Sequence, residues 1–207
     1  MTRRFTFPLR CVLAVLLALG SALALAHTGN DGALHHDIGD ALAAGFTHPL
    51  TGLDHLAAML AVGVWSALTA RRVWLAPLAF ASTVLIGALL GFAGLRLPAV
   101  EPMIAVSLLM LGLLVASRAQ LPVITGVALA AAFALFHGVA HGQELGGPFG
   151  GWALAGMVVA TALLHGIGIV MGLAMKRGHR WVPRAAGAAV ALFGLSLLVP
   201  ALLSGAA

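Results

Sequence analysis

Charged residues are scarce in this sequence, and so are cysteine and tyrosine. Only 8% of the residues are charged, 61% are hydrophobic, and the mean hydropathy is +1.07. One water-soluble core cannot bury that much apolar surface, so the composition predicts a membrane protein. The absence of tyrosine and of any long basic run argues against a nucleic-acid partner. No G-x4-G-K-[ST] motif occurs, so nothing in the chain indicates ATP-driven pumping.

The single cysteine, Cys11, lies in a segment that is typical of an export signal. Three arginines precede or flank an apolar run at residues 12–19, and an Ala-Leu-Ala sequence ending at Ala26 offers a small-residue cleavage site. We therefore expect residues 1–26 to be a signal peptide that is removed, with an uncleaved first span as the alternative. Cleavage would leave no thiol, which excludes disulfides, thiolate metal sites and cysteine nucleophiles in the mature protein.

Six apolar stretches follow, each near the roughly 20 residues that a helix needs to cross a bilayer. They cover residues 46–69, 73–93, 102–117, 121–140, 150–175 and 184–203. The sequence thus predicts an all-α membrane protein, in which a cleaved signal peptide is followed by a bundle of six transmembrane helices. Residues 27–45 would form a periplasmic N-terminal arm, and residues 46–207 the six-helix transmembrane domain.

Basic residues are concentrated in alternate loops of this expected bundle. These loops or their flanks carry Arg71, Arg72, Arg118, Lys176, Arg177, Arg180 and Arg184, whereas the opposite loops carry only Arg96. The side richer in lysine and arginine normally faces the cytoplasm. We therefore expect a multi-pass protein of the bacterial inner membrane whose mature N- and C-termini both face the periplasm.

The stretch HPLTGLDH concentrates ionisable groups in the first span. His48 and His55 are seven residues apart, which returns them to nearly the same face of a helix. Asp54 could ligate a cation or hold an imidazole in one tautomer. Pro49 and Gly52 indicate that the helix starts or loosens here, which would free backbone carbonyls as further ligands.

A second cluster lies in the stretch FHGVAHGQEL of the fourth span. His137 and His141 are four residues apart, so their imidazoles lie one above the other and could hold one ion. Glu144 adds an oxygen ligand or an attracting charge, and the glycine after each histidine is expected to keep the adjacent surface open. Imidazole and carboxylate without thiolate suit borderline divalent ions such as Ni²⁺, Zn²⁺ or Co²⁺. Ionisable groups inside a membrane are costly and mark functional sites.

Other histidines lie outside these clusters. His165, in the fifth span, is a candidate ligand or a hydrogen-bonded packing residue, with Met157 and Met171 within eight residues of it. The expected outer arm contains His27, His35 and His36, and short His-rich tracts of this kind can capture metal ions or simply be solvated.

Two small-xxx-small patterns, GALLG at residues 87–91 and GIVMG at residues 168–172, predict close helix packing. Such patterns are common in apolar helices, so they indicate a compact bundle and no chemistry.

The two polar stretches resemble signatures of the HupE/UreJ family of nickel permeases. HPLTGLDH fits H-x5-D-H, and FHGVAHGQE fits F-H-G-x-[AV]-H-G-x-E. The resemblance covers essentially the whole chain, and GFTHPLTGLDHLAAMLAVGVWSA is especially close. The residues that this match assigns to the ion path are His48, Asp54, His55, Phe136, His137, His141 and Glu144. Glu101, in VEPMIAVSLLMLGL, resembles an acidic residue on the outer part of the path.

The resemblance implies passive or secondary uptake of Ni²⁺ to supply a hydrogenase or a urease, with Co²⁺ or Zn²⁺ as other candidate ions and no permanently bound cofactor. Outer acidic groups would concentrate the hydrated dication, and the two clusters would replace part of its water shell. Cytoplasmic nickel chaperones would be the partners that remove it. Because only neutral imidazoles ligate, uptake should fall as the pH drops through about 6.

Two other classes of function are consistent with the same residues. In an intramembrane zinc hydrolase, three histidines would hold the metal, and Asp54 or Glu144 would activate its water. In a b-type haem carrier, imidazoles from two helices would be the axial ligands. The close spacing of His137 and His141 suits one small ion better than two separate haems, which favours the permease.

Overall fold

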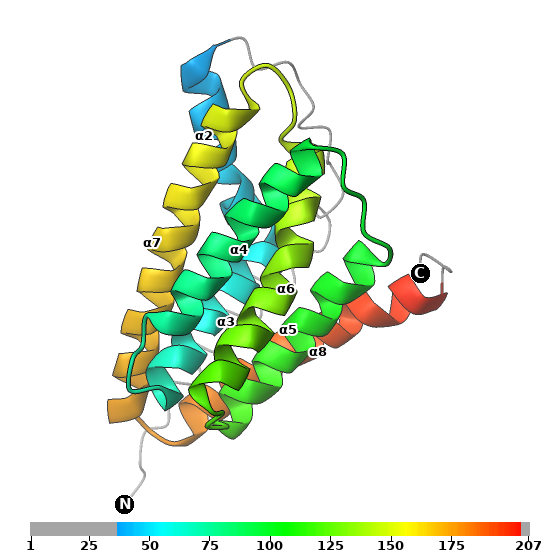
Figure 1. The fold of residues 1–207 in the computed structure, drawn as a ribbon. Coiled ribbons are helices and arrows are strands. Elements are labelled where there is room, and N and C mark those ends of the chain that lie inside the picture. Colours follow the sequence, from blue (N-terminus) through cyan, green and yellow to red (C-terminus); the bar gives the residue numbers. More distant parts are fainter. Residues whose placement is uncertain (1–36, 204–207) are drawn as a thin grey trace, which may run out of the picture.

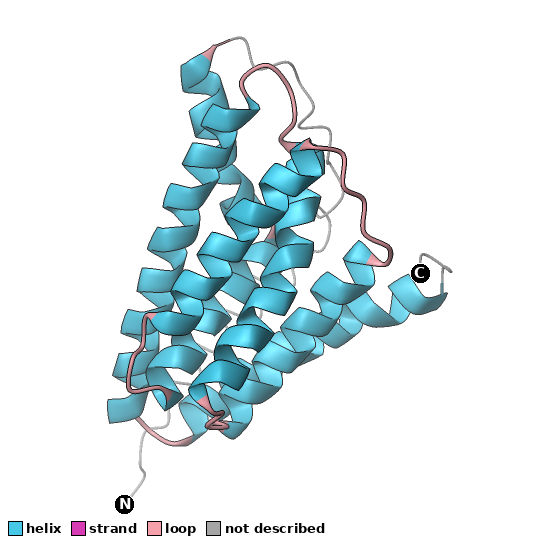
Figure 2. Cartoon of the chain, viewed as in Figure 1, coloured by secondary structure: helices cyan, strands magenta, loops and turns pink. Residues whose placement is uncertain are grey.

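The computed structural model describes residues 37–203, and this part of the chain is helical with no strands (Figures 1 and 2). The helices are α2 (Ile38–Thr51), α3 (Leu53–Thr69), α4 (Leu75–Phe92), α5 (Val100–Ser117), α6 (Val123–Glu144), α7 (Gly150–Arg177) and α8 (Trp181–Leu203). The expected signal peptide and the three arm histidines, His27, His35 and His36, lie outside the described residues.

Within the described residues, α4 to α8 are each long and apolar enough to cross a membrane. Helices α2 and α3 meet this criterion only as a pair, which is bent by 76°. Counted as one broken span, the pair brings the number of spans to six. The all-α membrane fold predicted from hydropathy is therefore confirmed.

The first span begins earlier than its hydropathy indicated. Helix α2 starts at Ile38 instead of residue 46, so residues 38–45 of the predicted arm are helical. The Asp37 side chain caps this helix by accepting a hydrogen bond from the Asp40 N–H at 2.9 Å. Gly45 then packs so closely against α7 that a Cβ there would collide with the Ala153 carbonyl. Capping and packing thus extend the helix beyond its most apolar part.

Gly52 separates α2 from α3, at the position where the sequence predicted a loosened helix. Pro49 lies inside α2 and lacks an N–H, and Gly52 adopts an extended conformation with φ −77° and ψ 103°. A Cβ at Gly52 would lie 3.1 Å from His55 Nδ1 and 3.2 Å from Asp54 Oδ1. The glycine therefore both breaks the helix and leaves room for the polar pair that follows.

Glycines pack α4 tightly against α6. Gly87 and Gly91 of α4 meet Gly138 and Gly142 of α6, with the Cβ position of Gly87 only 3.0 Å from the Gly138 Cα. A Cβ at Gly142 would collide with the Ala88 carbonyl. The GALLG pattern therefore does pack helices closely. The expectation that Gly138 and Gly142 leave an open surface is wrong, because α4 fills that space.

The second pattern, GIVMG, packs α7 against α3. The Cβ position of Gly168 lies 2.5 Å from the Leu60 carbonyl oxygen, and that of Gly172 lies 2.7 Å from the Val64 carbonyl oxygen. Helix α2 continues along the same helix, α7, while α5 pairs with α8 (Figure 1). The long α7 is thus the partner of both halves of the broken span.

The basic residues gather at one end of the bundle. The connections from α3 to α4, α5 to α6 and α7 to α8 lie at this end, and the connections from α4 to α5 and α6 to α7 at the other (Figure 1). Arg72, Arg118 and Arg180 lie in the first set, and Arg96 lies in the second. The basic loops and the loops with few basic residues, which the sequence predicted to alternate, therefore lie at opposite ends of the bundle.

Candidate metal centre

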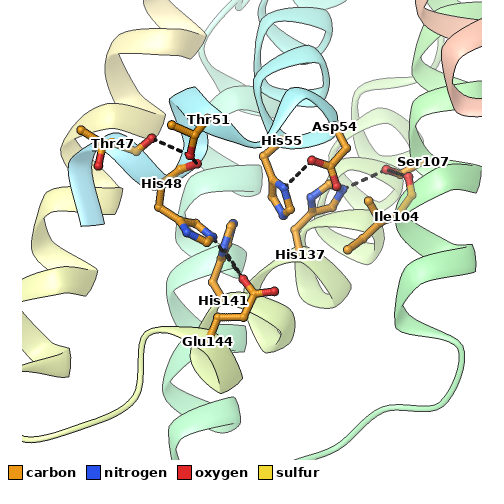
Figure 3. Close-up of polar contacts among 10 residues, drawn as sticks. All are labelled: Thr47, His48, Thr51, Asp54, His55, Ile104, Ser107, His137, His141 and Glu144. Atoms are coloured by element: carbon orange, nitrogen blue, oxygen red, sulfur yellow. Dashed lines mark hydrogen bonds and ion pairs between the residues drawn. The ribbon is translucent and has the colours of Figure 1, made fainter. Parts of the chain in front are cut away.

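Four histidines from α2, α3 and α6 lie together (Figure 3), near the end of α6 that leads into the connection to α7. The ring centroid of His141 is 4.8 Å from that of His48 and 4.3 Å from that of His55. The ring centroid of His137 is 5.0 Å from that of His55. The break at Gly52 lets both α2 and α3 direct a histidine at α6. Two clusters that were separate in the sequence thus form one centre.

The outer part of this centre consists of His48, His141 and Glu144. His48 Nε2 lies 3.1 Å from Glu144 Oε2, and His141 Nδ1 lies 4.0 Å from the same oxygen. One ligand atom from each residue comes within 4.8 Å of the others. Metal–ligand bonds of about 2 Å place ligand atoms roughly 3–4 Å apart, so small side-chain movements would suffice to bind one ion.

The centre is exposed at Glu144 and largely buried behind it. The Glu144 side chain is 53% exposed and that of His48 is 14% exposed, whereas His141 and His137 are fully buried. A carboxylate is therefore accessible at the outer end, and buried imidazoles lie behind it. This order suits capture of a hydrated cation followed by stepwise replacement of its water.

Asp54 orients His55. The two side chains lie 2.9 Å apart, with His55 Nδ1 facing Asp54 Oδ1 (Figure 3). The carboxylate is an acceptor, so Nδ1 of the neutral imidazole carries the proton and Nε2 carries the lone pair. His55 Nε2 is buried without a hydrogen-bond partner. Of the two roles that the sequence left open for Asp54, its contact with His55 favours orientation.

Ser107 of α5 orients His137 in the same way, although sequence reasoning did not identify it. Its hydroxyl donates to the Ile104 carbonyl at 2.7 Å and lies 2.9 Å from His137 Nε2 (Figure 3). Because the hydroxyl proton is already used, Ser107 Oγ accepts from His137 Nε2–H, which leaves the lone pair on Nδ1. His137 Nδ1 is buried and unpaired. A lone hydroxyl in an apolar helix was the only sequence signal.

His141 joins the outer part of the centre to these two oriented imidazoles, because its ring centroid lies 4.8 Å from that of His48 and 4.3 Å from that of His55. Both of its ring nitrogens are buried without a hydrogen bond. Unpaired buried polar atoms are costly, and more so in a membrane, where no water is at hand to pair them. The centre therefore offers lone pairs on His55, His137 and His141 that the protein itself does not satisfy.

Two residues that the resemblance assigned to the path lie apart from this group. Glu101 is exposed in the first turn of α5. Phe136 is partly buried and, being adjacent to His137 in a helix, points about 100° away from it. The aromatic ring that contacts His137 is instead that of Phe80 in α4, with centroids 5.6 Å apart.

His165 is buried in α7, beyond Phe80. The ring centroids of these two residues are 5.4 Å apart. Of the two methionines near His165 in sequence, Met157 is buried, whereas Met171 is 40% exposed on the outer surface of the bundle. His165 therefore remains a candidate ligand. Met171 is not near it inside the bundle, because Met171 lies on the outer surface.

Comparisons with known proteins show which family this chain resembles. A family model described as "HupE / UreJ protein" matches residues 13–197. Protein HupE of Rhizobium leguminosarum bv. viciae is 43% identical over 186 residues, which cover 88% of this chain and 93% of that relative. No solved structure matches the chain. The matched residues include every histidine of the centre.

Proposed function

This chain belongs to the HupE/UreJ family of multi-pass membrane proteins, and we propose that it is a permease for the uptake of Ni²⁺. The family is associated with nickel or cobalt uptake for hydrogenase or urease, so the metal ion is cargo and not a resident cofactor. We place the protein in the bacterial inner membrane, with the basic end in the cytoplasm and both mature termini in the periplasm.

One observation supports the proposal above the others: the broken first span and α6 bring four imidazoles and a carboxylate together inside a membrane-spanning bundle. This donor set, without thiolates, suits borderline divalent ions better than Mg²⁺ or Ca²⁺. The family relationship points to the same class of ion.

Uptake would begin at the outer group. The half-exposed Glu144 attracts the hydrated dication, and His48 and His141 then replace some of its water. The ring centroid of His141 also lies 4.3 Å from that of His55. The ion can therefore exchange one ligand at a time as it moves inward. Each state must bind weakly enough to release the ion to the next.

Asp54 and Ser107 prepare the inner ligands for this step. Their hydrogen bonds keep the lone pairs of His55 Nε2 and His137 Nδ1 available. The ion therefore meets imidazoles that need no change of tautomer before they ligate.

The membrane potential is a sufficient driving force for such a path. Moving one charge across 100 mV is worth about 2.3 kcal/mol, and a dication carries two charges. Removal of Ni²⁺ by cytoplasmic chaperones would keep the inner concentration low and make uptake one-way.

The alternative functions fit the geometry less well. The haem carrier is disfavoured because the ring centroids of His55 and His141 are 4.3 Å apart, which leaves no room for a porphyrin between the two imidazoles. A zinc hydrolase needs its metal-bound water to reach a substrate, whereas three of the four imidazoles are at most 8% exposed. Membership of a transport accessory family also favours a permease over an enzyme.

The test is uptake of radiolabelled Ni²⁺ into cells that lack their own nickel permease. Wild type should take up the ion, whereas His137→Ala and Asp54→Asn should fall to background at equal membrane levels. His179→Ala is the matched control, because His179 is exposed near the basic end. A correctly inserted wild type without uptake would contradict the proposal, and a metal-dependent amidase or peptidase activity would then favour the hydrolase.

A further inference from the structure

A second set of unpaired buried polar atoms lies on α7. Within residues 37–203, the buried side-chain nitrogen and oxygen atoms without a hydrogen-bond partner belong to only five residues. His55, His137 and His141 belong to the centre described above. The other atoms are Thr161 Oγ1 and both ring nitrogens of His165.

These two residues share one face of α7 with a methionine. Met157, Thr161 and His165 follow one another at intervals of four residues, and they are 0%, 1% and 2% exposed. The face points into the bundle, since His165 contacts Phe80 of α4 and its carbonyl lies against Gly63 of α3. A thioether, a hydroxyl and an imidazole thus form a short column inside the protein.

The inner end of the column, at His165, lies further from its helix end than His137 does, whereas Met157 is only seven residues from the start of α7. His165 is fifteen residues from the start of α7, or about 22 Å along its axis, whereas His137 is seven residues, or about 10 Å, from the outer end of α6. The Phe80 ring lies between the two sites, with its centroid 5.6 Å from that of His137 and 5.4 Å from that of His165. His165, at the inner end of the column, therefore lies beyond Phe80 from the histidine centre.

Thr161 is a buried helical threonine whose hydroxyl makes no hydrogen bond. A threonine hydroxyl in a helix usually bonds to the carbonyl four residues earlier. Thr47, Thr51 and Thr69 do so, although all three are more exposed than Thr161. The Thr161 hydroxyl makes no such bond, so its oxygen stays available inside the bundle.

His165 has the same property. The Thr161 carbonyl lies near its ring, yet neither ring nitrogen makes a hydrogen bond of ordinary geometry. Unpaired groups at this depth are costly in a membrane unless a ligand or water satisfies them in use. A histidine that served only to join helices would be paired with a neighbour.

We propose that Thr161 and His165, with the Met157 thioether beside them, form a second and inner binding station for a partly dehydrated divalent transition-metal ion. This inference rests on the proposed permease function. Imidazole, hydroxyl and thioether donors select softer ions than Mg²⁺ or Ca²⁺. A path with several weak stations also lets an ion leave the outer centre without a single large step.

The experiment compares His165→Leu and Thr161→Val with wild type in the full-length protein. Ni²⁺ uptake rates are measured in cells, and Ni²⁺ affinity and melting temperature are measured on the purified protein in lipid nanodiscs. We expect both variants to reduce the maximal uptake rate by roughly tenfold or more, the usual scale for losing a metal-site group. The concentration for half-maximal uptake should stay close to the wild-type value, because the outer centre captures the ion.

The melting temperature separates this role from packing. Leucine and valine remove unpaired polar atoms, so both variants should be as stable as wild type or more stable. Thr161→Ser keeps the hydroxyl and should retain uptake. Wild-type rates in His165→Leu and Thr161→Val would overturn the inner station, and so would a joint loss of uptake and melting temperature. The permease proposal itself would fail only if wild type took up no Ni²⁺.

Discussion

Helix α6 carries two neighbouring faces with opposite tasks. His137 and His141 face α2 and α3 and leave three ring nitrogens without a hydrogen bond. Gly138 and Gly142, each one residue further on, meet the α4 backbone so closely that no Cβ fits. The glycine face is fixed by contact with the α4 backbone, and the histidine face has ring nitrogens without hydrogen-bond partners. The comparison shows that the unpaired nitrogens of the proposed metal centre lie directly beside a tightly packed support.

Among three further variants, the largest effect should come from His141→Ala, which removes the histidine that touches both parts of the centre. We expect uptake of Ni²⁺ to fall by more than the 10–100-fold that loss of an outer-shell partner costs. The melting temperature should fall only by the cost of the cavity that the buried ring leaves, because the removed nitrogens have no hydrogen bonds to lose. Uptake assays and thermal melts of the same preparations check both parts. Retained uptake would show that the ligand face does not carry transport.

Gly142→Ala tests the packed face of α6 instead of the histidine face. Its new methyl group would collide with the Ala88 carbonyl, and overpacking of this kind typically costs about 1–3 kcal/mol of folding free energy. We expect a lower melting temperature and less folded protein in the membrane. Uptake per folded molecule should fall less than in His141→Ala.

Gly166→Ala is the matched control for this change, because a Cβ at Gly166 in α7 meets nothing within 4 Å. It should leave stability unchanged or slightly increased. Equal melting temperatures for the two variants would contradict the tight contact between α4 and α6.

The smallest of the three effects is expected for Ser107→Ala, which leaves every proposed ligand in place. His137 would lose the acceptor for Nε2–H, so both tautomers could form and fewer molecules would present the Nδ1 lone pair. We expect uptake to fall by about tenfold. The ¹⁵N chemical shifts of His137 should change from one tautomer to a mixture.

Ser82→Ala serves as the control, because Ser82 is exposed and donates only to carbonyls of its own helix. It should leave uptake and the His137 signals unchanged. A single unchanged tautomer in Ser107→Ala would show that another group orients His137.

Hydropathy predicted the spans well because the bilayer imposes a length on every helix. The break at Gly52 could also be predicted, since Pro49 and Gly52 alter the backbone locally. The start of α2 could not, because it depends on the Asp37 cap and on the contact between Gly45 and α7. A sequence pattern such as Pro49 and Gly52 predicts a change in the backbone at its own position. The start of α2 depends on contacts with another helix, which the local sequence does not contain.

The same limit applies to the candidate site. The spacing of His137 and His141 identified them as a pair, and intramembrane cost marked Asp54 and His55 as functional. That both pairs would meet depended on how α3 and α6 pack. Ser107 and Thr161 were missed, because hydroxyls are common in membrane helices and become informative only when their hydrogen bonds are known.

The break at Gly52 also has an electrostatic consequence. Helix α2 ends there, so the negative pole of its macrodipole lies beside His48, which is in its last turn. Helix α3 begins at the same place with its positive pole, but Asp54 lies in its first turn and offsets that charge. A dication at the proposed centre would therefore be stabilised by the dipole of α2 as well as by side chains. That contribution needs no further charged residue in the membrane.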